Sequence, residues 1–303
     1  MNPKNEPQRK SVGRRLLSWA LAALAVFVFV VALTVLNNNY SFHRRSRADF
    51  SAQLDRAIET STQWIVQHPE NQGNPPIMFM IGDMAEMSGD PRLHDFVQSY
   101  LASRRVRIPG DPTSWYYARL VDPTAPVPML MVNEASRIGW EDRWNAYATV
   151  PNRVELTAAD RADLFSPTKY SWGTRLHIQL LALDIYRHFN GPSAELDRAI
   201  NPVAEGVAND AYWDFRVNDS YYQRSAFLLG AGRPDLVRGR WIERILDYQH
   251  PDGAWSFCWY GWCRGVFEFR LGVGDQGHST VQAAWALYQL KYRYSQWIDR
   301  HYQ

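Results

Sequence analysis

The spacing of apolar side chains from Phe50 onward predicts a helical protein. Apolar residues recur every three or four positions, as they do on one face of an α-helix. The first such series, which should end near Pro69, is Phe50, Leu54, Ile58, Ser61 and Ile65. Alternation with a period of two residues is absent over useful lengths, so we expect almost no sheet.

Three further one-sided helices have recognisable start signals. Asp90 followed by Pro91 is an N-cap with proline at the first helical position. Ser193 opens another helix, whose apolar residues from Leu196 onward lie on one face. A fourth helix is expected to start near Pro234. Each should bury one face and leave the other to water.

Helices of a second kind lie between these. They are apolar nearly all round and comprise Ile77–Met87, Ala125–Val132, Ile178–Ile185 and Ala283–Leu290. A helix that is apolar on every side must be buried on every side. The alternation of the two kinds, about five of each, predicts an inner and an outer layer of helices. The expected fold is all-α, an N-terminal transmembrane helix followed by an incomplete α/α toroid of about five helical hairpins.

A long apolar segment precedes this domain. From Leu16 to Leu36 only Ser18 and Thr34 are polar. About 20 apolar residues cross a bilayer core of roughly 30 Å, so the segment is long enough to span one. The alternative is a cleaved signal peptide, which usually has a shorter apolar region that ends at a small-residue cleavage site. The exit here, Leu36 followed by asparagines 37–39, favours an uncleaved anchor.

Lys and Arg residues are more numerous before this segment than after it. They are Lys4, Arg9, Lys10, Arg14 and Arg15 on one side and Arg44, Arg45 and Arg47 on the other. This bias places the N-terminus in the cytoplasm. The expected organisation is a cytoplasmic basic tail (1–15), a transmembrane anchor (16–36), a linker (37–48) and the toroid domain (49–303). The protein should be single-pass in the inner (cytoplasmic) membrane, with the C-terminal domain periplasmic or extracellular.

Composition adds two constraints. The chain has 46% hydrophobic and 21% charged residues and a net charge of +2, with Lys and Arg scattered, so nucleic acid is not an expected partner. Aromatic residues are abundant, with 13 Trp, 16 Tyr and 13 Phe. A large helical core accounts for most of them, and the rest would suit a cleft for sugars or other ring-faced ligands.

Two motifs resemble known helical toroids. The stretch from Gln249 to Trp255, QHPDGAW, resembles the Q-x-x-D-G-x-W motif of the terpene-cyclase and protein-prenyltransferase toroids. Residues 277–287 are similar to the inner helix that follows that motif. The resemblance implies structural roles, in which Gln249 forms hydrogen bonds at the turn and Trp255 covers a helix end. The aspartate-rich acid motif of the cyclases is absent, which argues against a cyclase.

A second resemblance points to carbohydrates. Residues 170–181, YSWGTRLHIQLL, resemble the inner helices of α/α-barrel carbohydrate enzymes, including the helical domain of uronate C5-epimerases. In such barrels the ligand cavity lies where the inner helices begin. Free N–H groups and a partial positive charge are present at those helix starts. The resemblance therefore implies a site formed by polar residues at the starts of the inner helices.

The candidate site residues follow from that placement. The candidate catalytic residues are His278, Asp275 and Asp219. The candidate substrate-binding residues are Tyr170, Trp172, Arg175, Tyr221, Tyr222, Arg224 and Trp255. We expect the first three to share a polar cluster with Tyr222 and Arg175, and Arg175 to bind an acidic sugar. The alternative is that the aspartates are helix caps and the tyrosines belong to the core.

Acid–base chemistry on a glycosidic bond would need two carboxyl groups roughly 5–9.5 Å apart. The available carboxylates are Asp214, Asp219, Asp252 and Asp275. His177 lies inside an apolar helix, where a histidine is more often a satisfied core residue than a base. His278 opens a helix next to Gly277 and has the better claim to acid–base work.

Cys258 and Cys263 are the only two cysteines. Outside the cytoplasm, two cysteines this close favour a disulfide. Zinc held with Asp252 and His278, as the prenyltransferase resemblance would imply, and free thiols are the alternatives. We expect no metal and no cofactor.

The leading functional hypothesis is a membrane-anchored extracytoplasmic protein that acts on a carbohydrate, with a uronate-containing polymer as the substrate class. The reaction is open among hydrolase, lyase and epimerase, and the expected partners are a glycan or polysaccharide and the membrane. The alternative is a non-catalytic toroid that binds a glycan or a protein partner in an envelope assembly.

Overall fold

The computed structural model describes residues 6–41, 45–71, 75–102, 112–167, 173–214, 216–256 and 276–302. Within these ranges the chain is helical and contains no strand, and a single bridge pairs Leu130 with Val154. The predicted all-α class is therefore confirmed for the described residues. The long helices of the domain, from α2 onward, arise from the apolar periodicity of the sequence, because each buries the stripe or surface that the pattern marks.

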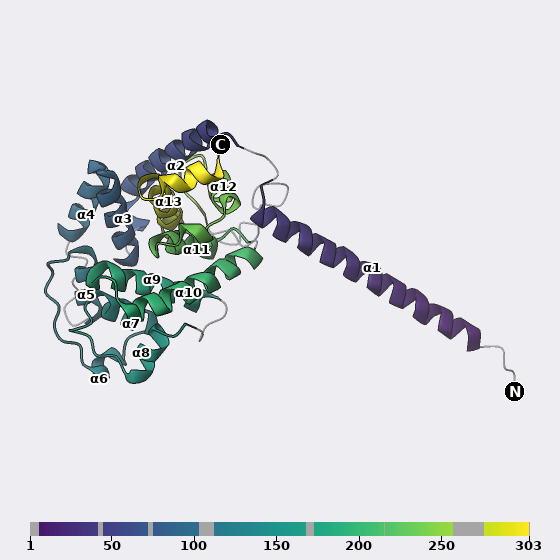
Figure 1. The fold of residues 1–303 in the computed structure, drawn as a ribbon, viewed down its shortest axis with the longest axis horizontal. Helices are drawn as coiled ribbons and strands as arrows, with labels where there is room; N and C mark the ends of the chain where they lie inside the picture. The colour runs from purple at the N-terminus through teal and green to yellow at the C-terminus, as the bar shows by residue number, and fades with distance from the viewer. Residues whose placement is uncertain are drawn as a thin grey trace.

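The helices follow one another along the chain and are separated by short connections (Figure 1). In order they are α1 (Glu6–Asn39), α2 (Arg47–Gln67), α3 (Pro75–Ser88), α4 (Pro91–Ala102), α5 (Pro112–Val121), α6 (Val132–Ala135), α7 (Trp140–Thr149), α8 (Ala158–Leu164), α9 (Thr174–Asn190), α10 (Ala194–Trp213), α11 (Asp219–Gly230), α12 (Gly239–Asp247), α13 (Gln276–Tyr292) and α14 (Ser295–His301). Two 3₁₀ turns, η1 (Pro69–Asn71) and η2 (Pro234–Leu236), interrupt the connections.

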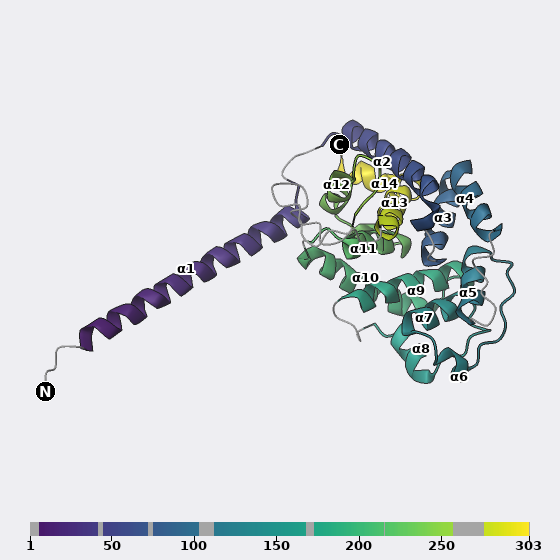
Figure 2. The same cartoon turned by 180° about the vertical axis from the view of Figure 1, so that it is seen from behind.

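Helix α1 projects away from the rest of the molecule in both views (Figures 1 and 2). Its apolar side chains are exposed, with Trp19 at 75% and Phe27 at 65%. The stretch Gly13–Asn39 is 27 residues long and apolar enough to cross a membrane. By length and composition this helix suits a membrane span or a signal sequence.

The end of α1 is bound tightly to the domain. The helix continues beyond the apolar run to Asn39, and Asn38 and Asn39 are 0% and 4% exposed. The Asn38 amide donates to the Ala211 carbonyl at 2.9 Å, and the Asn39 amide donates to that of Tyr212 at 2.8 Å. These bonds satisfy carbonyls at the end of α10, which have no partner within their own helix.

Six helices pack in a closed cycle. Helix α3 contacts α5, α5 contacts α7, and the series continues through α9 and α11 to α13, which packs back on α3. Helices α2, α4, α10, α12 and α14 each pack on one or more members of this cycle. The segments that are apolar all round lie inside it, and every residue of Ile77–Ile81, Leu180–Ile185 and Ala283–Leu290 is buried. The prediction of burial on all sides is confirmed for Ala283–Leu290. In Ile77–Met87, Glu86 is exposed and Gly82 and Met87 are half-buried, and in Ile178–Ile185, Ile178 is half-buried.

The starts of the one-sided helices agree with the sequence signals. Helix α4 begins at Pro91, and the Asp90 carboxylate accepts the Arg92 backbone N–H at 2.9 Å. Helix α10 is capped by Ser193, whose hydroxyl accepts the Leu196 backbone N–H at 3.2 Å. Such caps stabilise helices by satisfying N–H groups in the first turn.

Two predicted elements are wrong. The segment 125–132 is not a buried helix, since residues 125–131 are irregular and most are solvent-accessible. Pro126 and Pro128 explain this, because each lacks a backbone N–H and disfavours helical geometry in the residue before it. The helix expected near Pro234 also begins later. Pro234 starts the 3₁₀ turn η2, and α12 follows from Gly239.

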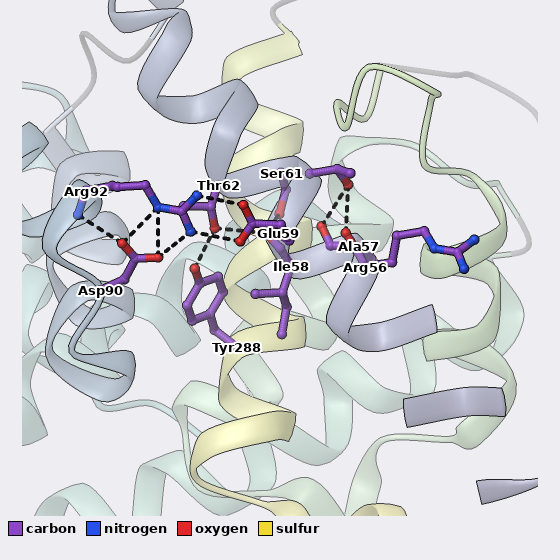
Figure 3. A network of polar contacts seen from close by, with 10 residues as sticks. Arg56, Ala57, Ile58, Glu59, Ser61, Thr62, Asp90, Arg92 and Tyr288 are labelled. Atoms are coloured by element: carbon purple, nitrogen blue, oxygen red, sulfur yellow. Dashed lines mark hydrogen bonds and ion pairs between the residues drawn. The ribbon is translucent and has the colours of Figure 1, made fainter. Parts of the chain in front are cut away.

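A polar network ties α2 to α4 and α13 (Figure 3). Arg92 at the start of α4 forms a two-pronged ion pair with Glu59 of α2, at 2.7 and 2.9 Å, and also pairs with Asp90 at 2.7 Å. Deeper in the interface the hydroxyls of Thr62 and Tyr288 are 2.6 Å apart. Because the ion pair is partly exposed and the hydroxyl pair is buried, the second contact orients α13 more strictly than the first orients α4.

The QHPDGAW turn is held by its own side chains. The Gln249 amide donates to the carbonyls of Ala57 at 2.9 Å and Gly253 at 3.0 Å. Gly253 has φ +95°, and a Cβ there would lie 2.3 Å from the Thr60 carbonyl oxygen, so only glycine fits. The Trp255 indole donates to the Ile245 carbonyl in the last turn of α12 at 2.7 Å. Gln249 and Trp255 thus make the contacts that the toroid resemblance implies.

Candidate functional site

Polar residues gather where α9, α11 and α13 begin. Helix α9 starts after Gly173, which has φ +94°. Helix α11 is capped by Asn218, whose side-chain oxygen accepts the Tyr221 N–H at 3.1 Å. Because Asn218 is the cap, the carboxylate of Asp219 is not used for capping. It is directed to the neighbouring helix α13 instead.

Asp219 and His278 form a histidine–carboxylate pair. The His278 Nδ1 lies 2.7 Å from Asp219 Oδ1. The Ser279 hydroxyl donates to the same carboxylate oxygen at 3.2 Å, and the Gln223 amide donates to Oδ2 at 2.8 Å. The side chains of His278 and Asp219 are 29% and 17% exposed. The pair is therefore held by several bonds and remains accessible to solvent.

The hydrogen bonds of this pair determine its chemistry. A carboxylate at Nδ1 fixes the proton on that nitrogen and leaves Nε2 as the atom that exchanges a proton, as in other histidine–carboxylate pairs. The Gln282 amide nitrogen lies 3.1 Å from Nε2 of His278. The same amide nitrogen lies 3.3 Å from Nδ1, so Gln282 contacts the imidazole beside both ring nitrogens. A neutral imidazole whose partner fixes its tautomer is suited to act as a general base.

A second histidine cluster lies deeper, between α9, α10 and α11. His177 is 0% exposed, and its Nε2 lies 3.3 Å from Asp210 Oδ2 and accepts Nε–H of Arg224 at 3.1 Å. Asp210 also accepts the Gly173 backbone N–H at 2.9 Å. Burial lowers the pKa of His177, against the opposing effect of Asp210. His177 is therefore neutral near pH 7.

Arg224 connects this cluster to a further carboxylate. Its guanidinium lies 2.9 Å from Asp214, which is also paired with Arg216 at 2.6 Å. Although burial of Asp214 acts in the opposite direction, its bonds to Arg216 and Arg224 lower its pKa. Asp214 is therefore an ionised, doubly paired carboxylate and a poor proton donor.

Several buried polar atoms of these clusters have no hydrogen-bond partner among the described residues. They are Nδ1 of His177, Oδ1 of Asp210, Nη1 of Arg224, Oε1 of Gln223 and Oε1 of Gln282. All lie on α9, α10, α11 or α13. An unsatisfied buried polar group is unfavourable, so each of these atoms could accept or donate a bond to a water or a polar ligand.

Other candidate residues lie elsewhere. Arg175 lies over the α7 tryptophans, with its guanidinium carbon 4.5 Å from the Trp140 ring centroid. Tyr221 and Tyr222 are each 1% exposed, and burial raises the pKa of Tyr221 to about 12. Trp255 is fully buried in the turn described above. The two tyrosines and Trp255 pack within the protein, and Arg175 is exposed and lies over Trp140, so we do not include these four in the site proposed below.

The remaining candidates lie outside the described residues. They are Tyr170, Trp172, Asp275, Cys258 and Cys263. The predicted disulfide, its zinc alternative and the role of Asp275 therefore stay predictions. Within the described ranges, His, Cys, Asp and Glu side chains do not gather in groups of three or more that could bind a metal ion.

Sequence reasoning missed part of the cluster. Gln223 and Gln282 each lie four residues after the aspartate or histidine that they contact, which is one helical turn. Polar residues at that spacing in nearly apolar helices were a usable signal. Asp210 follows Val207 by three residues on the apolar face of α10. A carboxylate on a buried face was a second usable signal for the site.

The chain has no matching protein-family model, and no curated protein or solved structure was found to be similar to it. What defines its class is the structure itself. The chain is an all-helical protein with one long N-terminal apolar helix and a histidine–carboxylate pair at the starts of α11 and α13. A functional assignment therefore depends on this pair and the residues around it.

Proposed function

We propose that this protein is a membrane-anchored, extracytoplasmic enzyme that acts on a carbohydrate, with a uronate-containing polymer as the substrate class. The observation that carries the proposal is the Asp219–His278 pair, with its 2.7 Å separation and partial exposure. A positioned base of this kind can accelerate a proton transfer by about 10²–10⁴-fold.

The proposed architecture is an α/α toroid of helical hairpins. It is supported by the closed cycle of contacts from α3 to α13 and by the helices that pack around that cycle. It is also supported by the Gln249 and Trp255 contacts, which are those of the resembling toroids. In such an arrangement the starts of α11 and α13 line the mouth of the cavity.

The described carboxylates favour proton abstraction over glycoside hydrolysis. Hydrolysis normally needs two carboxyl groups across a cleft. Asp219 is bound to His278, and Asp214 is paired with two arginines, so both carboxyl groups already have partners within the protein. A histidine base instead suits removal of the proton next to a uronate carboxylate, which starts both elimination and epimerisation. We therefore propose lyase or epimerase chemistry with His278 as the base.

The proposed location follows from α1. We propose that α1 is retained as an anchor and that the domain lies outside the cytoplasm, consistent with the excess of Lys and Arg before the apolar run. A reporter that is active only outside the cytoplasm should be active when fused after Gln303. Thiol labelling of the unreduced protein should find Cys258 and Cys263 unreactive if they form the proposed disulfide.

A non-catalytic toroid that binds a glycan or an envelope protein is the second candidate. The observation that favours it is the position of the Gln282 amide nitrogen, which lies 3.1 Å from Nε2 and 3.3 Å from Nδ1 of His278 and covers the nitrogen that a base would use. For catalysis, substrate must displace this amide. For binding alone, the amide and the imidazole can both serve as fixed polar contacts.

The experiment is a screen of uronate-containing and neutral glycans for unsaturated or epimerised products. His278→Gln and Asp219→Asn should each lower the rate by about 10²-fold or more. His94→Gln changes an exposed histidine on α4 and should leave the rate unchanged. If the wild-type chain converts no glycan but one is retained by affinity, the enzyme proposal fails and the binding protein stands.

A further inference from the structure

The junction between α1 and the domain contains a pocket with a volume of about 560 Å³. It is lined by residues of α1 and the following turn, the end of α10, η2, the start of α12 and the end of α14, among them Asn39, Tyr40, Tyr212, Arg238, Trp241 and His301. The volume lies within the roughly 300–1,000 Å³ range of small-ligand sites. Three aromatic rings and one guanidinium thus meet directly beside the last turn of the apolar helix.

Arg238 is the charged group that distinguishes this pocket. Its guanidinium carbon lies 4.9 Å from the Tyr212 ring centroid and 5.5 Å from that of Tyr40. Its neighbours are neutralised, since Arg233 pairs with Asp235 at 2.8 Å and Arg240 pairs with Glu243 at 3.3 Å. Among the described residues Arg238 forms no such ion pair. An arginine stacked between aromatic rings is well placed for two-pronged binding of an anion.

The base of the pocket is rigid. The Trp241 indole donates to the Asn39 side chain at 3.0 Å, and Arg244 donates to Asn38. The Asn39 amide is bound in turn to the Tyr212 carbonyl. These bonds hold α1 against α10 and α12, so the pocket keeps a fixed position relative to the apolar helix.

That position corresponds to the headgroup layer of a bilayer. Asn39 lies three residues beyond Leu36, which is about 4.5 Å further along the helix axis. The headgroup region extends about 5–7 Å beyond the hydrocarbon core on each side. Tyr40 and Trp213 are 48% and 51% exposed nearby, and such aromatic residues are enriched at the membrane interface.

We propose that this pocket binds the phosphate of a membrane glycerophospholipid, with Arg238 as its principal ligand. The inference rests on the part of the proposed function that keeps α1 in the membrane, and it is independent of the glycan chemistry. Asp235 also lines the pocket, but its ion pair with Arg233 limits its repulsion of an anion. A lipid bound here would fix the domain at one height and orientation on the membrane surface.

The test is native mass spectrometry of the full-length chain released from detergent. Dioleoylphosphatidylglycerol should give one retained lipid, and dioleoylglycerol, which lacks the phosphate, should give none. Arg238→Ala should weaken retention at least about tenfold, because charge-assisted bonds are lost. Arg238→Lys should weaken it less, since the charge remains but the two-pronged geometry is lost. Arg56→Ala removes an exposed arginine of α2 and should leave retention unchanged.

The outcomes separate the site from the anchor. The intact mass in the same spectrum shows whether α1 is present. If α1 is present and no lipid is retained, or if Arg238→Ala retains as much as the wild type, the site is overturned and the anchor stands. If α1 has been removed, both proposals fail. Equal retention of dioleoylglycerol, or full displacement by inorganic phosphate at millimolar concentration, would also overturn a lipid-phosphate site.

Discussion

His177 with Asp210 and His278 with Asp219 are two histidine–carboxylate pairs near the starts of α9 and α13. In the first pair the side chains are 0% and 1% exposed, and the imidazole also accepts a bond from Arg224. In the second pair they are 29% and 17% exposed, and the bound neighbours are neutral amides and a hydroxyl. The two pairs have the same chemical composition and very different surroundings.

The difference shows how surroundings divide structure from chemistry. In the buried pair Arg224 donates to Nε2 of His177, and the Gly173 backbone N–H donates to Asp210. These bonds occupy the acceptor atoms that a reaction would need, and solvent is excluded. The same two bonds therefore link the start of α9 to α11 and α10. In the exposed pair the carboxylate fixes one ring nitrogen, and the neutral Gln282 amide lies beside the other. Displacing a neutral amide requires less energy than separating the buried Arg224 from Asp214.

The largest expected effect is on the buried pair. Asp210→Ala should lower the free energy of unfolding by about 2–3 kcal/mol, because it removes a buried carboxylate and leaves the Gly173 N–H without its acceptor. Asp219→Ala should lower it by about 1 kcal/mol, since its partners can be hydrated. Denaturant unfolding of both variants in detergent measures the difference. Equal losses would show that burial does not distinguish the pairs.

The pH dependence of stability should also come from the buried pair. Because burial lowers the pKa of His177, the folded chain binds fewer protons than the unfolded chain. His177 therefore does not change the free energy of unfolding above about pH 6.5. Below that pH the unfolded chain takes up a proton on His177, and the free energy of unfolding falls by up to about 1.4 kcal/mol per pH unit. His177→Gln should remove that part of the slope. Unfolding free energies of the wild type and the variant between pH 5.5 and 8.5 measure it.

The slopes of wild type and His177→Gln should coincide above about pH 7.5, where the imidazole is neutral in both the folded and the unfolded chain. This range serves as the control, because carboxylates and arginines contribute equally to both proteins there. A difference in slope that persists at high pH, or none at low pH, would contradict the assigned burial of His177.

The two arginines around Asp214 offer a smaller and closely matched test. Arg224 is 5% exposed and bonds to both His177 and Asp214, whereas Arg216 is 41% exposed. Arg224→Lys should lower the free energy of unfolding by about 1–3 kcal/mol, because an ammonium cannot reproduce the two-sided geometry of the guanidinium. Arg216→Lys should change it by less than about 0.5 kcal/mol. Thermal or denaturant unfolding compares the two variants, and a reversed order would contradict the buried network.

The sequence predicted those features that depend on local spacing. The apolar period placed α2 and its buried face, and cap residues placed the starts of α4 and α10. It failed where proline overrides the pattern. Residues 125–131 are apolar enough for a buried helix, yet Pro126 and Pro128 prevent one. Hydrophobicity specifies that a segment is buried or packed, while backbone chemistry decides which conformation it adopts.

The site was predictable only in part. Positions at helix starts indicated that Asp219 and His278 could meet, and the structure places them 2.7 Å apart. The same reasoning grouped Tyr221 and Tyr222 with them, although both are buried. A helix that is apolar nearly all round carries no period that shows which side faces a cavity. The pairing of His177 with Asp210 depends on how two helices pack, which spacing along one chain does not encode.

The smallest expected effect on stability concerns His278, and it gives the clearest contrast in reactivity. His278→Gln should change the free energy of unfolding by about 1 kcal/mol or less, because the imidazole is partly exposed and Gln retains a donor and an acceptor. The same exposure should let diethylpyrocarbonate modify His278 in the folded chain, whereas the fully buried His177 should react only after unfolding. Peptide mapping of the treated wild-type chain measures both sites. If His177 is modified as fast as His278, the buried pair opens in solution and the proposed division between a structural and a reactive histidine fails. If neither is modified in the folded chain but both are when it is denatured, His278 is covered in solution, and the proposed reactive pair loses its access to substrate.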